Sequence, residues 1–191
     1  MRARNTWKVL VTLVVAVLFG VIMQIFKGNT IGIRNAIGNL SVPWLLLPYL
    51  SGKLVGQRKI WVSAGIGLAA SMVALFGFYA ADPFVWNLTH QGLLANVLLT
   101  LDAGRRWFLL AFLSGPVFGG LAVFQRRRQA SVILAGIATL IIVEPFAHVI
   151  YDNLTNSPLL PSGVTVWTVE FISGAIITWH IIKRLKFNTV E

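Results

Sequence analysis

Residues 7–26 read WKVLVTLVVAVLFGVIMQIF, an apolar run interrupted only by Lys8 at its edge and Gln24 near its end. A transmembrane helix needs about 20 mostly apolar residues. The run is too long for the apolar part of a secretory signal, and no small-residue cleavage site follows it. We therefore expect residues 7–26 to form an uncleaved first membrane helix.

The composition of the whole chain agrees with this first segment. Of 191 residues, 57% are hydrophobic, only 12% are charged and none is cysteine. Soluble globular domains carry about 25% charged residues. The composition therefore excludes an ordinary water-soluble domain, a disordered chain and a disulfide-rich secreted module.

Further apolar segments predict an all-α polytopic membrane protein with six spans, forming one transmembrane domain over residues 1–191. The expected spans are residues 7–26, 42–56, 60–81, 107–124, 130–151 and 164–182. Between the third and fourth spans, leucines at helical spacing predict a short helix over about residues 91–102. This helix is too short to span, so we expect it to lie at the outer interface.

The positions of the basic residues explain the net charge of +10. With the N-terminus inside, twelve Lys and Arg residues fall in inner segments and four in outer segments. This bias predicts a cell-membrane protein with both termini cytoplasmic. Anionic lipid headgroups are the expected contacts of the inner loops, and the charge requires no nucleic-acid partner.

Two pairs of segments are similar to one another, which predicts an internal repeat. Residues 44–52, WLLLPYLSG, align with residues 107–115, WFLLAFLSG, and the following spans continue the match. The expected unit is a parallel repeat of a helical hairpin, formed by spans two and three and by spans four and five. Small residues let helices approach closely. The predicted packing positions are Ser51, Gly52, Ser114, Gly115, Ser173 and Gly174.

The residues that break the repeat give the candidate site. Glu144 and Glu170 lie in spans five and six at matching depth, and a charged group at the helix centre costs about 2.5–3.5 kcal/mol on insertion scales. His148 follows Glu144 by one helical turn and Tyr151 lies a further turn outward, while Trp167 precedes Glu170 on one face. These five residues are expected to line a polar site near the outer side. The site can hold a proton, a cation, an amine or a metal, or the carboxyls can form a hydrogen-bonded tie between two helices.

Three functional hypotheses follow. The first is a transport or binding protein for a small solute or cation. The second is a structural or partner-binding membrane subunit, whose partner is another membrane protein or a second copy. The third is an enzyme acting on a lipid, although the sequence has no HExxH, GxSxG or phosphate-binding motif. We expect no catalytic residues, no cofactor and no metal centre.

Several segments carry a resemblance to a known family. Residues 38–44, GNLSVPW, and 113–120, LSGPVFGG, with Glu144 and the pair Val169-Glu170, together resemble an uncharacterised bacterial family of small six-helix membrane proteins. That resemblance implies an inner-membrane setting and no particular activity. The chain is also similar to substrate-capture subunits of energy-coupling-factor vitamin transporters in its size, its number of helices and its basic inner loops. The alanine-xxx-alanine coupling motif of those subunits has only Ala16 and Gly20 as its nearest match in span one.

Overall fold

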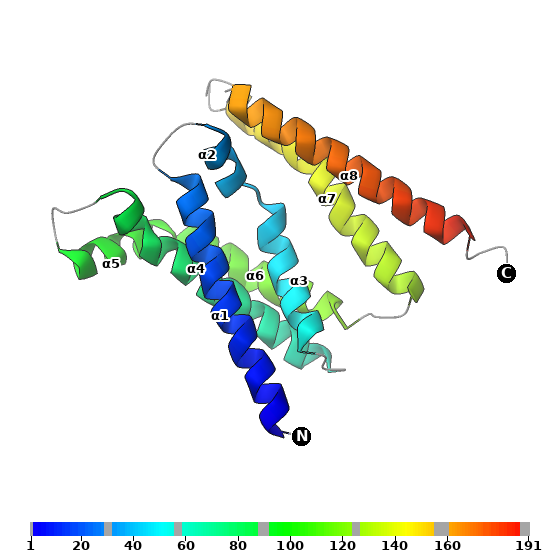
Figure 1. The fold of residues 1–191 in the computed structure, drawn as a ribbon, viewed down its shortest axis with the longest axis horizontal. Coiled ribbons are helices and arrows are strands. Elements are labelled where there is room, and N and C mark those ends of the chain that lie inside the picture. The colour runs from blue at the N-terminus through cyan, green and yellow to red at the C-terminus, as the bar shows by residue number, and fades with distance from the viewer. Residues whose placement is uncertain are drawn as a thin grey trace. The chain divides into compact units, whose positions relative to one another are not determined.

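The structure is a computed structural model of residues 1–191. It describes residues 2–28, 32–55, 59–87, 92–123, 127–154 and 161–187, with side chains for 6–28, 32–55, 59–87, 92–123, 135–150, 153–154 and 161–183. These residues are mainly helical and contain no strand. The helices are α1 (Arg2–Lys27), α2 (Ile33–Gly38), α3 (Val42–Leu54), α4 (Ile60–Val85), α5 (Leu93–Ala103), α6 (Arg105–Leu121), α7 (Arg127–Leu154) and α8 (Pro161–Phe187), drawn in Figure 1.

The contacts gather the chain into two compact units, Met1–Val123 and Phe124–Glu191. The first contains α1 to α6 and the second contains α7 and α8. The expected all-α fold is confirmed. The single transmembrane domain stays a prediction, and each unit is described by itself.

Among the described residues, three helices are long and apolar enough to cross a membrane, which indicates a membrane protein. They are Thr6–Lys27, Ile60–Val85 and Pro161–Lys183. The other expected spans differ in length: α3 has 13 residues, or about 20 Å, against a hydrocarbon core of about 30 Å. Helix α6 has 17 residues and begins with Arg105 and Arg106. The six-span arrangement therefore stays a prediction.

Helices α1 and α4 pack backbone against backbone because glycine lies on both sides of the contact. A Cβ placed on Gly20 would lie 1.8 Å from the Ala74 carbonyl oxygen, and one on Gly77 would lie 2.6 Å from the Val17 carbonyl oxygen. Further out, the Gln24 side chain donates a hydrogen bond to Asp82. Because Gly20 also adjoins Phe78 and Gln24 meets Asp82, the two helices run in the same direction.

Helix α4 packs just as closely against α6, again through glycine. A Cβ on Gly67 would lie 2.5 Å from the Gly115 carbonyl oxygen, and one on Gly119 would lie 2.5 Å from the Ser63 carbonyl oxygen. Position 63 pairs with 119 while 67 pairs with 115, so α4 and α6 are antiparallel. On α3, Gly52 approaches Gly119 in the same way. The small-residue contacts therefore hold α3, α4 and α6 together.

The core of the first unit is small and aromatic. Ala16, Ala70 and Ala74 are fully buried at its centre. Trp44 of α3 makes edge-to-face contacts with Phe19 and Phe78, at centroid distances of 5.2 and 5.5 Å. Such pairs contribute roughly 0.5–1.5 kcal/mol beyond their burial. Trp44 therefore links α1, α3 and α4.

Helix α4 continues through Pro83, beyond the expected end at residue 81. Proline lacks the amide that would bond to the carbonyl of Tyr79. The Thr100 hydroxyl of α5 donates to that carbonyl instead, at 2.9 Å. The freed backbone group is thus satisfied, and α4 extends to Val85.

The short helix expected at about residues 91–102 is present as α5, Leu93–Ala103. It begins after Gly92, whose φ of 78° favours glycine. Two of its polar residues, Asn96 and Thr100, are buried, whereas Leu93, Leu94, Leu98 and Leu99 are 56–73% exposed. This polarity is opposite to that of a helix on a water-soluble protein.

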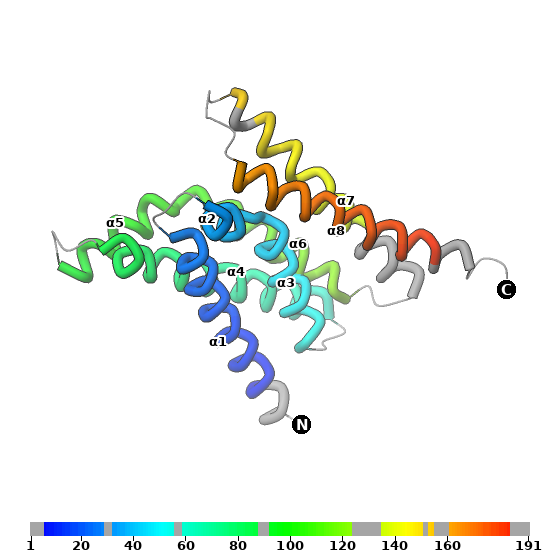
Figure 2. The backbone as a smooth tube through the Cα atoms, turned by 45° about the horizontal axis from the view of Figure 1, so that its top comes forward, coloured from blue at the N-terminus to red at the C-terminus, as the bar shows by residue number. Residues whose placement is uncertain are grey.

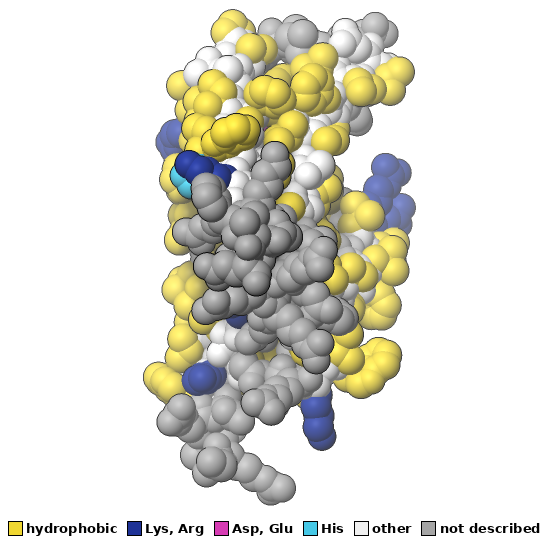
Figure 3. Space-filling view, turned by 90° about the vertical axis from the view of Figure 1, so that its right-hand side faces the viewer, with side chains coloured by type: hydrophobic (Ala, Val, Ile, Leu, Met, Phe, Trp, Pro, Cys, Tyr) yellow, Lys and Arg dark blue, Asp and Glu magenta, His cyan; other side chains and the backbone are white. Residues whose placement is uncertain are grey.

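The described surface is largely apolar. In Figure 3, hydrophobic side chains cover most of the described atoms on the face in view, and Lys and Arg appear at isolated points. On α6 alone, Leu109, Phe112, Leu113 and Val117 are 58–67% exposed. Soluble monomers rarely expose such large patches, so this surface is typical of contact with lipid or another protein.

Candidate functional site

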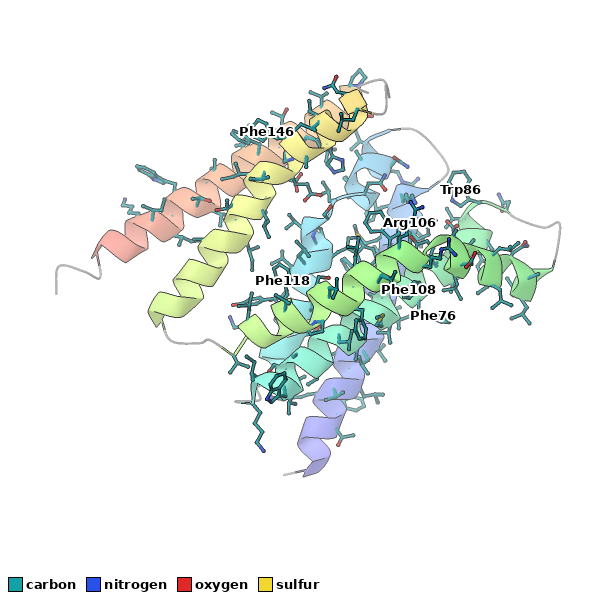
Figure 4. All side chains as sticks on the ribbon, turned by 180° about the vertical axis from the view of Figure 1, so that it is seen from behind. Phe76, Trp86, Arg106, Phe108, Phe118 and Phe146 are labelled. Carbon is teal, nitrogen blue, oxygen red and sulfur yellow. The ribbon has the colours of Figure 1, made fainter. Side chains whose placement is uncertain are left out.

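The candidate site lies on the α7–α8 hairpin of the second unit. The two helices lie against each other in both Figure 1 and Figure 2. A Cβ on Gly174 would lie 2.9 Å from the Ile142 side chain, so glycine permits the close approach. One turn away, Phe146 of α7, labelled in Figure 4, meets Phe171 of α8 edge-to-face at 5.8 Å. These contacts set the register of the hairpin.

Glu144 and Glu170 come together within this register. Both residues are buried, with 8% and 9% of their surface exposed. The side chain of Glu170 is hydrogen-bonded to that of Glu144. An ionised carboxylate can only accept hydrogen bonds, so this bond requires a proton on one of the two groups. The other oxygen of Glu170, Oε2, is buried and has no hydrogen-bond partner.

His148 extends the polar cluster toward the surface. Its Nε2 atom lies 3.6 Å from Oε1 of Glu144, one turn along α7, and 28% of its side chain is exposed. The imidazole stacks on Trp167 of α8, with ring centroids 5.1 Å apart and planes inclined by 8°. The indole therefore holds the imidazole in the plane that points Nε2 toward Glu144.

Four of the five expected site residues thus come together: Glu144, His148, Trp167 and Glu170. Tyr151 lies on α7, but its side chain is outside the described residues. Pro145 follows Glu144 directly inside the helix and cannot donate to the carbonyl of Ile141. Among the residues with described side chains, no group of three or more His, Cys, Asp or Glu is placed to hold a metal ion.

The expected packing residues have different environments. Gly52, Gly115 and Gly174 each lie against a neighbouring helix. Ser51 is buried, Ser114 is half-buried and Ser173 is exposed. The Ser173 hydroxyl donates to the carbonyl of Val169 on its own helix, at 2.7 Å. Trp44 and Trp107 are aligned in the expected repeat, but Trp44 packs against the core whereas Trp107 is 58% exposed. The repeat therefore stays a prediction.

A second polar cluster was missed by the sequence reasoning, because the third span was expected to end at residue 81, just before Asp82. Asp82 instead lies in α4, half-buried, and accepts hydrogen bonds from Gln24 and Trp86. Gln24 is fully buried, and its Oε1 atom has no hydrogen-bond partner. Lys27 lies near the Asp82 carboxylate, with Nζ 5.2 Å from the centre of the Phe78 ring. The signal was present in the sequence, since Gln24 interrupts an otherwise apolar run.

Fold and site together define an all-α protein with apolar helices long enough to cross a membrane and a buried pair of carboxyl groups. No family model, curated protein or solved structure matches the chain. The resemblances drawn from its motifs therefore stay predictions.

Proposed function

We propose that this chain is a multi-pass protein of the cell membrane that binds or transports a small solute or cation at Glu144 and Glu170. The observation that carries the proposal is the buried, hydrogen-bonded pair of carboxyl groups between two apolar helices. Ionisable groups inside a membrane are costly, and they commonly mark the pathway of an ion or substrate. His148 provides the partly exposed end of the cluster.

The same contacts support a rival role. A hydrogen bond between two carboxyl groups joins α7 to α8 and would serve a structural or partner-binding subunit equally well. A pair of apolar residues would join the helices with no cost of burying polar groups. The presence of both acids and an adjacent imidazole therefore favours a site over a tie.

Our proposal places both termini in the cytoplasm and retains six spans with a hairpin repeat. The twelve-to-four distribution of basic residues supports this orientation. Helix directions agree with it: α1 runs parallel to α4, α4 is antiparallel to α6, and α7 is antiparallel to α8. These relations are those of spans one, three, four, five and six in an alternating topology.

Substitution of the carboxyls tests the site. Full-length protein is reconstituted in vesicles on a solid-supported membrane, and the charge displaced by jumps in pH, sodium, potassium or methylammonium is recorded. We expect wild type to respond to at least one jump, and Glu144→Gln and Glu170→Gln each to reduce that response by about tenfold or more. The matched control is Asp102→Asn, an exposed carboxylate on α5 that should leave the response unchanged.

The structural role makes a different prediction for the same variants. If the acids only tie α7 to α8, the glutamine variants lower the thermal midpoint in detergent, and wild type displaces no charge in any jump. That result would reject a binding or transport function at this site.

The proposal also places α5 at the outer membrane interface with its leucines in lipid. Because the chain has no cysteine, Leu94→Cys can be labelled with an environment-sensitive fluorophore at a unique position. Leu94 is 73% exposed, and we expect its label to emit at shorter wavelength in vesicles and to be quenched by nitroxide-labelled lipid. Asp102→Cys, on the same helix, is the control and should respond to aqueous iodide instead. Iodide quenching at position 94 would contradict the interfacial placement.

A further inference from the structure

We propose that the ligand of the α7–α8 site is the proton, and that Glu170, Glu144 and His148 form a relay in that order toward the protein surface. This inference rests on the proposed function, because it identifies which cation the site handles. Its basis is the geometry of the three groups, which distinguishes a proton from the other ligands that two acids and an imidazole can bind.

The hydrogen bond between the two acids already contains one proton. Two ionised carboxylates repel each other and share no hydrogen, so the pair in this geometry has a proton on Glu144 or Glu170. A metal ion or an ammonium group would instead lie between two carboxylates, separating them. Consistent with this, no three-ligand cluster for a metal occurs among the residues whose side chains are described. The smallest cation is therefore the one that this arrangement fits.

Glu170 is the end of the relay opposite His148. Glu170 is 9% exposed, and its Oε2 atom is buried without a hydrogen-bond partner. A carboxyl oxygen in that position can take up or release a proton without first breaking a hydrogen bond. Because Glu170 is only 9% exposed, little water reaches it, which favours directed transfer over leakage.

The outer end of the relay is His148, whose side chain is 28% exposed. In the inward direction the shared proton starts on Glu170 and Glu144 is ionised. The imidazole takes a proton at one nitrogen, gives the Nε2 proton to Oε1 of Glu144 and returns to its neutral form. Glu170 then releases its proton, and Glu144 passes its own proton to Glu170, which restores the singly protonated pair. The Nε2–Oε1 distance of 3.6 Å exceeds a hydrogen bond, so the side chains must approach each other or a water must bridge them.

Trp167 acts as a positioning residue in this scheme. Its indole stacks on the imidazole at 5.1 Å, so the ring can move within its plane toward Glu144 but cannot easily turn away. Replacing Trp167 by leucine should lower proton transfer while leaving the acid pair intact. A merely structural role would lower the thermal midpoint without lowering the rate of proton transfer by the folded protein.

The described side chains of α7 and α8 place no other titratable group next to the relay. Within residues 135–150 of α7 and 161–183 of α8, the other titratable groups are His180 and Lys183 near the far end of α8. Lys183 and His180 lie 13 and 10 residues from Glu170, about 20 and 15 Å along the helix. His180 therefore serves as a matched control for His148.

The test measures proton movement directly. Full-length protein is reconstituted in vesicles that trap a pH-sensitive dye, and a potassium gradient with valinomycin drives protons inward. We expect Glu170→Gln, Glu144→Gln and His148→Gln each to slow acidification by about tenfold or more, while His180→Gln changes it by less than about twofold. In wild type, infrared spectra should contain the carbonyl stretch of a protonated carboxyl group, and Glu170→Gln and Glu144→Gln should each alter it.

A second variant distinguishes loss of the carboxyl group from misfolding of the protein. Glu170→Asp keeps a carboxyl group, so it should restore part of the acidification that Glu170→Gln loses. Equal loss in both variants, or an unchanged rate in His148→Gln, would overturn the relay. If sodium, potassium or methylammonium jumps displace charge through the acids while acidification is absent, the proton is the wrong ligand and the proposed function stands. If no ion responds at all, the proposed function fails with it.

Discussion

Gly20→Ala is expected to destabilise the first unit by about 3 kcal/mol or more, although it adds a single methyl group. The new Cβ would lie 1.8 Å from the carbonyl oxygen of Ala74 and 2.9 Å from the amide nitrogen of Phe78. Both neighbours are helix backbone and cannot rotate away, so α1 and α4 must separate. Overpacking that moves backbone typically costs about 1–3 kcal/mol and sometimes more. The measurement is the midpoint of thermal unfolding in detergent, followed as the loss of the monodisperse chromatographic peak.

Gly65→Ala is the matched control and is expected to act in the opposite direction. Gly65 lies in α4, exposed, and a Cβ at this position meets no atom within 4 Å. The change should stabilise the helix by up to about 1 kcal/mol, because glycine is a poor helix former. Equal loss in both variants would show that helix separation is not the cause at position 20.

Much of the helical fold could be predicted from the sequence, because each helix except one follows an apolar segment. The exception is α2, Ile33–Gly38, whose six residues are too few for an apolar period to be recognised. Helix ends were less predictable. The end of α4 beyond residue 81 depends on Thr100 of another helix, which donates to the carbonyl freed by Pro83. Such a contact belongs to tertiary structure and has no local signal.

For Glu144 and Glu170, the sequence predicted only their depth along the helix axes. Rise per residue placed Glu144 and Glu170 at equal depth, but depth does not determine the rotation of a helix about its axis. The hydrogen bond between them and the stack of His148 on Trp167 depend on that rotation. Gln24 and Asp82 were missed because the third span was expected to end at residue 81, whereas α4 continues to Val85 and includes Asp82.

Glycine positions illustrate the same limit. Gly65 faces open space, whereas Gly67, two residues on, meets Gly115 of α6. A shift of two residues turns a side chain by about 200° around a helix. Composition therefore predicted glycine-mediated packing, and only the structure assigns the glycines that provide it.

Asp82→Leu is expected to destabilise the first unit by about 3 kcal/mol, because it leaves a fully buried amide unpaired. The Gln24 side chain has no exposed surface, and its Oε1 atom has no hydrogen-bond partner. Its amide nitrogen donates a hydrogen bond to Asp82, and Asp82→Leu removes this acceptor. A buried polar group without a partner costs about 1–3 kcal/mol by mutational data and more in apolar surroundings. Asp82→Asn keeps an acceptor oxygen for Gln24 and should cost less than about 1 kcal/mol by the same reasoning.

The double variant Gln24→Leu/Asp82→Leu separates this explanation from simple loss of packing. Removing both partners leaves no orphaned group, so the double variant should be more stable than Asp82→Leu alone by about 2 kcal/mol, despite carrying one more substitution. The comparison uses unfolding midpoints in detergent for the wild type, both single variants and the double variant. Additive losses in the double variant would mean that each side chain packs independently. In that case the hydrogen bond between α1 and α4 contributes little to the stability of the first unit.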